Sequence, residues 1–548
     1  MYQIENINEE ILKLGVTFSQ GITNYKKNHK KNHFEDIVTI QAIEEDENLS
    51  LDEKNKLVDI LNSAIDPFEK RVRVMRALDK EKDFSSKISL IVRDRLPKME
   101  MIKKIMLVFR DSYITGHVLK KEFGEVLTPI GTVSDMIKEI DENFWKSAYN
   151  EDGSIKRVLD CCNGSGIFLW MVIYKFMIGL DKFIENEDDR YKFIIEKMIY
   201  ACEIQRSKMF HWLCIVDIYD TYDVNIYRGS FLDDGFNEMK DAWEIDKFSL
   251  ILSNPPYQQE VKGGSQKPLY DKFILKSIEI SDKILFITPS RWFSGGKGLD
   301  NFRKKMMSRR DIKIINHFED ASKIFGNGIF ITGGINYFLI DKNYSGDVTL
   351  NGITLNLNKF DIIVKNPTSY KLIDKMSKYE CIDKICKGQS YSGITTNDKR
   401  LFNTKINDNY IKCYVSKRNG YVKWIDIKYI RSIDILKWKV ILTEATNAID
   451  SGHGSYLSFG NKFIGKPNEI CNQSYIIFEV NTELEAKSLL SYLNCKLVNY
   501  LVSLRKISQH TKPDTCKWVP MVPFDREWTD EKLFEYFELT EIEKELVK

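Results

Sequence analysis

The stretch Phe248-Ser-Leu-Ile-Leu-Ser-Asn-Pro-Pro-Tyr257 joins an apolar run typical of a buried strand to a polar loop. Two consecutive prolines cannot continue a strand ladder, so the chain is stiffened into a fixed loop at the sheet edge. Such a loop can hold the amide oxygen of Asn254 and a backbone carbonyl as two acceptors for one amino group. The ring of Tyr257 offers a stacking surface for a planar substrate. The stretch therefore predicts a site that orients an amino group on a planar ring.

Similar apolar runs recur along the chain and are separated by segments with helical patterns. This alternation predicts an α/β fold with a mostly parallel sheet and helices on both faces. Ligands of such sheets bind at the carboxyl ends of the strands. The other runs are RVLDCC (157–162), FIIEKMIYACEI (193–204), VNIYRGSF (224–231), KILFITPS (283–290), IKIINHF (312–318) and GGINYFLI (333–340).

Two of these runs end in residues suited to a nucleotide-like ligand. Asp160-Cys-Cys-Asn-Gly-Ser-Gly166 places tight glycine turns before a helix N-terminus, although an ordinary turn between strand and helix has the same appearance. Glu203 closes the next run, where its carboxylate can accept two hydrogen bonds from the vicinal diol of a ribose. An exposed glutamate at a strand end remains the alternative. The long separation between these two motifs predicts an additional helix between Asp181 and Lys197.

Taken together, these motifs resemble the N6-adenine DNA methyltransferases that use S-adenosylmethionine (SAM). The NPPY tetrapeptide matches, and DCCNGSG looks like the family's DPxxGSG cofactor loop. Tyr113 through Gly124-Glu-Val-Leu-Thr-Pro129 resembles the upstream segment that closes over the methionine end of SAM. Ile287-Thr-Pro-Ser-Arg-Trp292 and the segment from Leu299 to Arg303 resemble a later catalytic motif. The motif order is that of the gamma class, close to the Eco57I-like modification enzymes of restriction–modification systems.

The resemblance implies a fold, domains and site residues. We expect a helical N-terminal region (1–105), a Rossmann-like SAM-dependent methyltransferase domain (106–343) and a mixed α+β target-recognition domain (344–548). It implies transfer of a methyl group from SAM to N6 of a flipped adenine in double-stranded DNA. The implied catalytic residues are Asn254, Pro255, Pro256 and Tyr257. The implied cofactor-binding residues are Thr128, Pro129, Asp160, Asn163, Gly164, Gly166, Glu203, Ser230, Phe231 and Asn254.

The sequence departs from the family pattern at two positions. Cys161 stands where the family usually has proline, which loosens the loop but leaves its glycines. Ser230 stands where an aspartate commonly holds the adenine amino group of SAM, so Asp233 or Asp234 is a candidate substitute. A second ring for the substrate base could come from Tyr337 or Phe338, but core packing is the better interpretation of both.

The first hundred residues have helical patterns. Ser50 and Glu53 form a predicted capping box before an apolar face. We expect that face to contain Leu57, Ile60, Leu61, Ala64 and Ile65. The basic run from Lys27 to His33 could contact phosphates, although a solvated helix face is the simpler interpretation.

Beyond about residue 341, turn signals such as Tyr344-Ser-Gly-Asp347, Arg418-Asn-Gly420 and Asp450-Ser-Gly-His-Gly454 break up short strand-like runs. Residues 345–525 hold about 26 Lys+Arg against about 17 Asp+Glu, the local basic excess expected of a nucleic-acid surface. Aromatic and basic residues are mixed most closely between 410 and 438, although strands of any β-rich domain are also aromatic. The residues concerned are Tyr410, Lys412, Tyr414, Lys417, Arg418, Tyr421, Lys423, Trp424, Lys428, Tyr429, Arg431, Lys437 and Trp438.

Composition and net charge limit the classes of protein to which this chain can belong. The net charge of the 548-residue chain is only +2, so attraction to DNA must be local. The chain has no signal-peptide pattern at its start and no apolar window long enough for a membrane span, so we expect a cytoplasmic protein without a membrane partner. Ten cysteines without paired spacing and seven histidines without a zinc pattern predict free thiols and no metal site.

Three other functions compete with the leading one. A protein-glutamine or RNA-adenine methyltransferase also uses NPPY, but such enzymes usually lack a basic C-terminal domain of this length. A bifunctional restriction–modification enzyme would need a nuclease in the first hundred residues, where we find no strand-borne P-D…(D/E)-x-K pattern. A scaffold with an inactive methyltransferase fold is disfavoured by the intact NPPY. A separate restriction endonuclease as partner is compatible with the leading function.

Overall fold

A computed structural model describes residues 38–46, 49–78, 82–115, 128–232, 234–261, 265–326, 329–389, 391–416, 420–430, 435–446, 458–506 and 509–547. The chain divides into two compact units, Met1–Asp361 and Ile362–Lys548. Each unit has its own hydrophobic core, and each is described by itself below.

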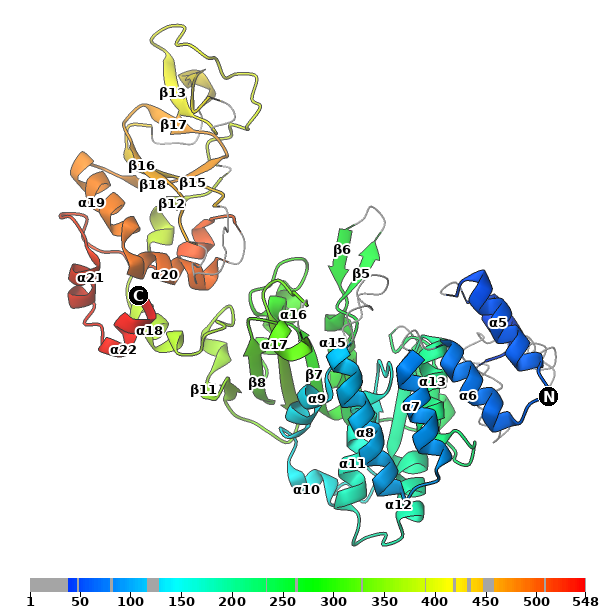
Figure 1. Ribbon diagram of the computed structural model, residues 1–548. Helices are drawn as coiled ribbons and strands as arrows, with labels where there is room; N and C mark the ends of the chain where they lie inside the picture. The colour runs from blue at the N-terminus through cyan, green and yellow to red at the C-terminus, as the bar shows by residue number, and fades with distance from the viewer. Residues whose placement is uncertain are drawn as a thin grey trace. The chain divides into compact units, whose positions relative to one another are not determined.

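In the described part of unit 1, nine strands form one sheet in the order β11-β10-β8-β9-β7-β4-β1-β2-β3. The pairs from β3 through β7 are parallel, whereas β9 runs antiparallel between β7 and β8. The predicted fold class, a mostly parallel α/β sheet with a helical N-terminal region, is confirmed (Figure 1). The strands are β1 (Val158–Asp160), β2 (Ile199–Glu203), β3 (Asn225–Arg228), β4 (Phe248–Ser253), β7 (Ser281–Pro289), β8 (Ile312–Phe318), β9 (Ile335–Asp341), β10 (Val348–Leu350) and β11 (Ile353–Leu355).

The central strands are buried along their whole length, which explains why they read as continuous apolar runs. After β1 the chain forms β2 on one side, and it later returns to form β4 on the other side. This reversal of strand order is the topological switch point, where α/β sheets bind their ligands. Tyr337 and Phe338 of β9 are buried in the core, as the simpler interpretation predicted.

Helices follow the strands and cover the sheet. Helix α11 (Ile167–Gly179) packs on β1 and β2, and α13 (Arg206–Asp217) packs on β2 and β3. The predicted helix between the two cofactor motifs is present as α12 (Glu187–Phe193), extended by a π-helical turn, η1 (Ile194–Met198). The remaining helices of this part are α9 (Ile130–Ile137), α10 (Glu142–Trp145), α14 (Gly235–Trp243), α15 (Tyr270–Ile280), α16 (Asp300–Met307) and α17 (Ser322–Phe325).

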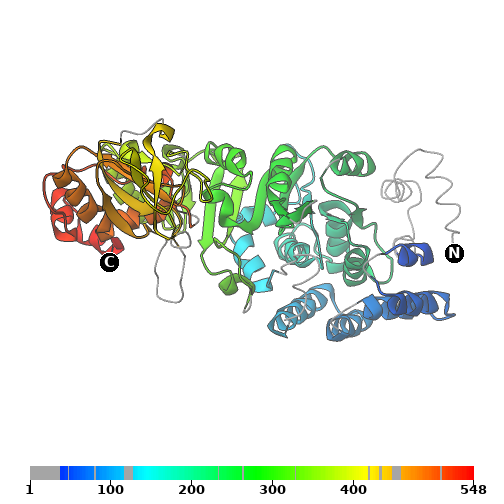
Figure 2. The same cartoon turned by 90° about the horizontal axis from the view of Figure 1, so that it is seen from above.

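The N-terminal helices form an outer layer on α11 and α13, drawn blue in Figure 2. The predicted capping box of Ser50 and Glu53 is present at the start of α5. However, α5 ends at Asn62, before Pro67 opens the next helix, so the expected apolar face is shorter than predicted and Leu57 is its buried member. The helices are α4 (Ile40–Glu44), α5 (Leu51–Asn62), α6 (Pro67–Leu78), α7 (Lys82–Arg93) and α8 (Lys98–Thr115).

The expected domain boundaries do not coincide with breaks in the structure. Position 105 lies inside the continuous helix α8, and the buried residues of α6 to α8 share one core with the sheet. Position 343 precedes β10 and β11, which extend the same sheet through the parallel pairing of β10 with β8. The N-terminal helices are therefore part of unit 1, and unit 1 continues to Asp361.

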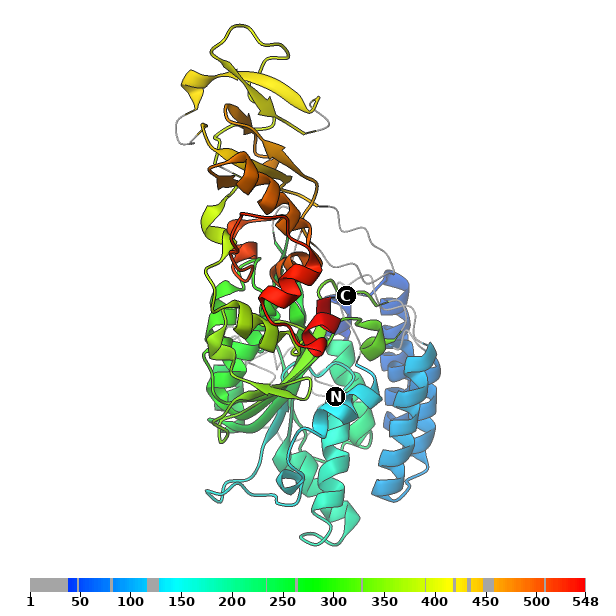
Figure 3. The same cartoon turned by 90° about the vertical axis from the view of Figure 1, so that its left-hand side faces the viewer.

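The described part of unit 2 contains two small sheets and several helices. A four-stranded sheet has the order β12-β18-β15-β16, and a three-stranded sheet has the order β14-β13-β17. Most of their strands are drawn yellow to orange in Figure 3. The strands are β12 (Cys386–Lys387), β13 (Tyr410–Tyr414), β14 (Val422–Asp426), β15 (Trp438–Thr443), β16 (Lys462–Gly465), β17 (Glu469–Cys471) and β18 (Tyr475–Val480). The helices are α18 (Ser369–Met376), α19 (Glu483–Asn494), α20 (Lys496–Arg505), α21 (Asp530–Tyr536) and α22 (Glu541–Val547).

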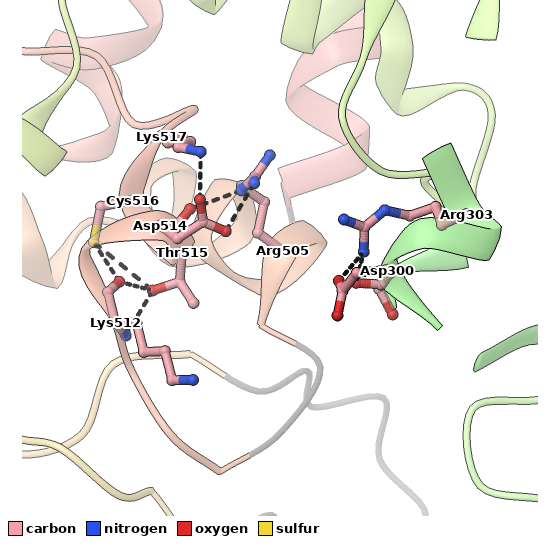
Figure 4. A network of polar contacts seen from close by, with 9 residues as sticks. Asp300, Arg303, Arg505, Lys512, Asp514, Thr515, Cys516 and Lys517 are labelled. Carbon is pink, nitrogen blue, oxygen red and sulfur yellow. Dashed lines mark hydrogen bonds and ion pairs between the residues drawn. The ribbon is translucent and has the colours of Figure 1, made fainter. Parts of the chain in front are cut away.

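A buried arginine fixes the loop that follows α20. Arg505 donates from Nε to the carbonyl of Asp514 at 2.8 Å and from Nη2 to its carboxylate at 3.0 Å (Figure 4). Its guanidinium also lies 4.5 Å from the ring centroid of Trp518. Because all of these partners are internal, this arginine stabilises the unit and is not a candidate for contacting DNA.

Candidate active site

A cavity opens at the carboxyl ends of β1, β2 and β4. Its volume of about 420 Å³ is that of a pocket for a small cofactor. It brings together most residues predicted from the sequence, although they come from segments far apart in the chain. The predicted residues that line it are Thr128, Asn163, Gly164, Glu203, Ser230, Phe231, Asn254, Pro255, Pro256 and Tyr257. Three other predicted residues, Pro129, Asp160 and Gly166, do not line the cavity.

The glycine turn after β1 has the backbone that its sequence predicts. Gly164 and Gly166 have φ values of +52° and +83°, in the left-handed region that favours glycine. A Cβ atom on Gly166 would lie 2.0 Å from Cε3 of Trp212, so only glycine lets α11 start against α13. The loop is therefore shaped by packing as well as by backbone conformation.

Asn163 presents a polar side chain to the cavity. It is 3 % exposed, and neither its amide oxygen nor its amide nitrogen has a hydrogen-bond partner among the described residues. A buried amide without partners is costly, so this position fits a ligand that both donates and accepts hydrogen bonds.

Asp160 holds the loop after β1 in place through hydrogen bonds of its carboxyl group. Its Oδ1 accepts hydrogen bonds from the backbone N–H of Cys162 at 3.0 Å and from Oγ of Ser253 at 2.8 Å. Complete burial raises the pKa of Asp160 to about 7, against the lowering effect of these two hydrogen bonds. The carboxyl group thus ties the loop after β1 to the end of β4, which carries NPPY.

Glu203 lies at the end of β2, and its carboxylate faces the cavity. Its two oxygens accept backbone N–H groups, Oε2 from Gly164 at 2.7 Å and Oε1 from Gln205 at 2.8 Å. A carboxylate that lines a cavity is a suitable acceptor for the hydroxyl groups of a vicinal diol. The alternative of an exposed glutamate is wrong, because Glu203 is 7 % exposed.

Apolar side chains form the wall of the cavity beyond Glu203. Phe231 and Phe273 are stacked with ring centroids 5.8 Å apart, and Ile204 lines the cavity although its side chain is 65 % exposed. Ser230 also lines the cavity, and its Oγ accepts from the backbone N–H of Leu232 at 3.1 Å. These surfaces suit a flat heterocycle such as adenine.

The NPPY loop holds its first residue in a fixed orientation. Nδ2 of Asn254 donates to Oγ1 of Thr128 at 3.0 Å. Because the amide group is planar, this bond directs Oδ1 to the opposite side of the group. Burial holds the pKa of the Tyr257 phenol in the same loop well above its usual value.

Sequence reasoning missed several lining residues. Ile204 and Phe273 have no polar signal, and Gln259, Leu269 and Lys272 follow NPPY without a recognisable motif. Of the expected residues, the side chain of Tyr113, residues 124–127 and Asp233 lie outside the described residues. The same holds for the basic run from Lys27 to His33.

In the described ranges, no group of three or more His, Cys, Asp or Glu side chains is arranged to hold a metal ion. None of the helices in those ranges has the length and apolar character needed to cross a membrane. The ten cysteines are free thiols, and eight of them are buried.

Comparison with known proteins matches residues 181–325 to the Eco57I restriction-modification methylase family. An uncharacterised adenine-specific methylase of Mycoplasma pneumoniae is 25 % identical over 339 residues, which are 48 % of this chain and 75 % of the relative. A DrdV–DNA complex covers 92 % of this chain and 71 % of its own, with 11 % identity and a TM-score of 0.42. A modification subunit of a type I restriction enzyme from Vibrio vulnificus YJ016 covers 50 % and 63 %, with 14 % identity and a TM-score of 0.33.

The family match and the NPPY loop together define the class of protein, an adenine-specific DNA methyltransferase. Within that class, the chain carries the Eco57I restriction–modification methylase match, so the family predicted from the sequence is confirmed.

Proposed function

We propose that this enzyme binds SAM in the cavity described above and transfers its methyl group to N6 of an adenine extruded from double-stranded DNA. The observation that carries the proposal is the convergence of Asn163, Glu203 and the NPPY loop on one cavity at the switch point of the sheet. A restriction–modification system in the cytoplasm, with a separate endonuclease as partner, is the setting that the family supports.

The residues of the cavity fit the parts of SAM. The partnerless amide of Asn163 suits the amino and carboxylate groups of the methionine end, beside the N-terminus of α11. Glu203 suits the ribose hydroxyls, and the wall of Ile204, Phe231 and Phe273 suits the adenine ring. Bound SAM supplies an activated methyl group on a positively charged sulfur.

The chain's own residues then have mainly a positioning task. Oδ1 of Asn254 and the carbonyl of Pro255 accept hydrogen bonds from the target amino group and direct its lone pair along one line. Tyr257 stacks on the extruded base, because N6 cannot be reached inside the duplex. A sulfonium is already a good methyl donor, so in-line positioning matters more than a general base.

Sequence-specific recognition is assigned to unit 2. Along β13, the half-buried Tyr410, Lys412 and Tyr414 alternate with the buried Ile411 and Cys413, so the polar and aromatic residues share the opposite face of their sheet. Three exposed rings come from segments next to β14. Tyr421 directly precedes this strand, Tyr429 ends the 3-10 turn that follows it, and Phe402 is bridged to Trp424 within it.

Some of the predicted cations have internal partners. Lys412 donates to the phenol of Tyr414 at 2.9 Å and lies 3.5 Å from the carboxylate of Glu469, so it is partly neutralised within the unit. Lys428 also has an internal partner, since its Nζ lies 3.1 Å from the carboxylate of Asp426, but its side chain is 64 % exposed, against 33 % for Lys412. It also lies 5.0 Å from the ring centroid of Tyr429. We therefore place the proposed DNA contacts on Tyr421, Lys428 and Tyr429 in preference to Lys412. Lys417, Arg418 and Arg431 lie outside the described residues.

The direct test is to express the chain in cells that lack adenine methylation and to sequence their DNA with a method that reads N6-methyladenine. Methylation at one recurring sequence is expected. Incubation of the purified chain with magnesium, SAM and plasmid DNA tests the bifunctional alternative, for which site-specific fragments would be the signature. Methyl transfer to RNA or protein without transfer to DNA would overturn the proposal.

A further inference from the structure

A separate two-stranded sheet starts directly at the NPPY loop. Strands β5 (Gln258–Val261) and β6 (Ser265–Pro268) pair only with one another in the described part of the chain, and they project from the body of the large sheet (Figure 1). A backbone hydrogen bond from the N–H of Leu269 to the carbonyl of Tyr257, 3.2 Å long, closes the base of this hairpin. The hairpin is therefore anchored to the residue proposed to stack on the target base.

The register of the hairpin separates its side chains into two faces. Gln259 is paired with Lys267, so both side chains point to one face, whereas Gln258 and Gln266 belong to the opposite face. Gln259 lines the cavity, which identifies its face as the one turned to the mouth of the active site. Lys267 lies on the same face and is exposed.

The composition of this hairpin excludes a core-forming role. An isolated two-stranded hairpin is marginally stable, and side chains such as Gln258, Gln266 and Lys267 bury no apolar surface that would hold it in place. A polar hairpin at the mouth of a catalytic cavity is suited to contact with the substrate. A two-stranded ribbon fits the major groove of DNA, glutamine amides pair with base edges, and lysine contacts phosphate.

We infer that the face of this hairpin formed by Gln259 and Lys267 contacts the DNA next to the target adenine. Gln259 hydrogen-bonds to the nucleotide at the mouth of the cavity, and Lys267 contacts a phosphate beside it. This inference rests on the proposed function and adds a DNA-contacting element of unit 1 to the recognition assigned to unit 2.

The test compares the full-length variants Gln259→Ala and Lys267→Ala with two matched controls. Gln266→Ala removes the same amide from the opposite face of the hairpin. Lys197→Ala removes an exposed lysine directly before β2, at the sheet edge away from the cavity. Initial rates of methyl transfer to unmethylated plasmid DNA at limiting DNA, and SAM affinity by calorimetry, are measured for all four variants.

The two test variants are expected to lower kcat/KM for DNA by about tenfold each, with SAM affinity within about twofold of the parent, while both controls stay near the parent. Lys267→Ala should also reduce the slope of log KM against log salt by about one, because one phosphate contact is lost. Test variants that match their controls would overturn the inference, as would a rate loss explained by an equal loss of SAM affinity. A parent chain that transfers no methyl group to DNA would refute the proposed function itself, and this inference with it.

Discussion

At the scale of single residues, two asparagines in the same cavity have separable tasks in the function we propose. Asn163 lies on the cofactor loop and presents a partnerless amide, whereas Asn254 is held by Thr128 in the NPPY loop. The NPPY assignment was accessible from the sequence because a rigid tetrapeptide after a buried strand has few other uses. The unsatisfied amide of Asn163 was not, since it depends on what the folded chain places around that side chain.

This separation leads to a prediction for the pair Asn254→Ala and Asn163→Ala. Asn254→Ala should lower kcat by a factor of about 10² or more, because an acceptor that orients the amino group is lost, and should leave SAM affinity nearly unchanged. Asn163→Ala should weaken SAM binding by about tenfold, because the contact it makes is to the cofactor. Calorimetric titration with SAM and single-turnover methylation measure the two effects. Equal effects of both variants on SAM affinity would contradict the division of tasks.

Asp160 allows a prediction on pH. Burial raises its pKa in the folded chain to about 7 from an ordinary value of 3.8, so between these values the folded state holds a proton that the unfolded state has lost. The stabilising contribution is therefore complete below about pH 4 and is lost as the pH rises towards 7. In Asp160→Asn, the melting temperature should fall less between pH 4.5 and pH 8 than in the parent.

Asp217 supplies the control for this experiment. It is also buried with a pKa of about 7, and it accepts backbone N–H groups from Thr221 and Tyr222 away from the cavity. Asp217→Asn should flatten the pH dependence of stability in the same way but leave the pH dependence of SAM binding as in the parent. If only Asp217→Asn reduced the pH dependence of the melting temperature, the pH-dependent contribution to stability that we assign to Asp160 would be wrong.

At the scale of elements, the apolar runs located the strands from β1 to β9 of the large sheet well, because the central ones, β1, β2 and β4, are buried along their whole length. The runs did not include β10 and β11. The sequence did not reveal that β9 runs antiparallel, that a π-helical turn precedes β2, or that α5 ends at Asn62. Pairing direction and helix ends depend on contacts between segments distant in the chain. The same reason explains why Ile204 and Phe273 were missed as walls of the cavity.

The two glycines of the cofactor loop provide a matched prediction at this scale. Gly164→Ala should lower the unfolding free energy by about 1 kcal/mol, the cost of a left-handed backbone at alanine. No steric cost is added, because the nearest atom to the new Cβ is 4.0 Å away. Gly166→Ala adds a collision with the ring of Trp212 and should cost about 3 kcal/mol or more of unfolding free energy. Denaturant titration of the two variants measures the difference. Equal losses would show that packing against Trp212 does not constrain the loop.

At the scale of the whole molecule, the division at Asp361 separates the proposed chemistry from the proposed recognition. A fragment of residues 1–361 should bind SAM with an affinity close to that of the parent and should lose discrimination between its target sequence and other DNA. Calorimetry and competition binding with target and non-target duplexes measure the two properties. A fragment that still selects the target sequence would place recognition in unit 1.

A second fragment, ending at residue 343, tests where unit 1 stops. It lacks β10 and β11 and therefore the buried side chains of Val348 and Leu350, which complete the sheet beside β8. Its melting temperature should be lower than that of the 1–361 fragment. Identical melting temperatures would mean that the two strands contribute little to the unit.

The strand order of the large sheet also bears on how the chain is made. β1 lies inside the sheet between β2 and β4, but β4 and the strands β7 to β11 are synthesised only later, so the sheet cannot be completed until about residue 355 has left the ribosome. At ordinary translation rates, the apolar edge formed by β1 and β2 remains unpaired for on the order of ten seconds or more, until the later strands of the sheet have been synthesised. During that interval the nascent chain offers unpaired strand edges, and ribosome-associated chaperones are the natural agents to cover them.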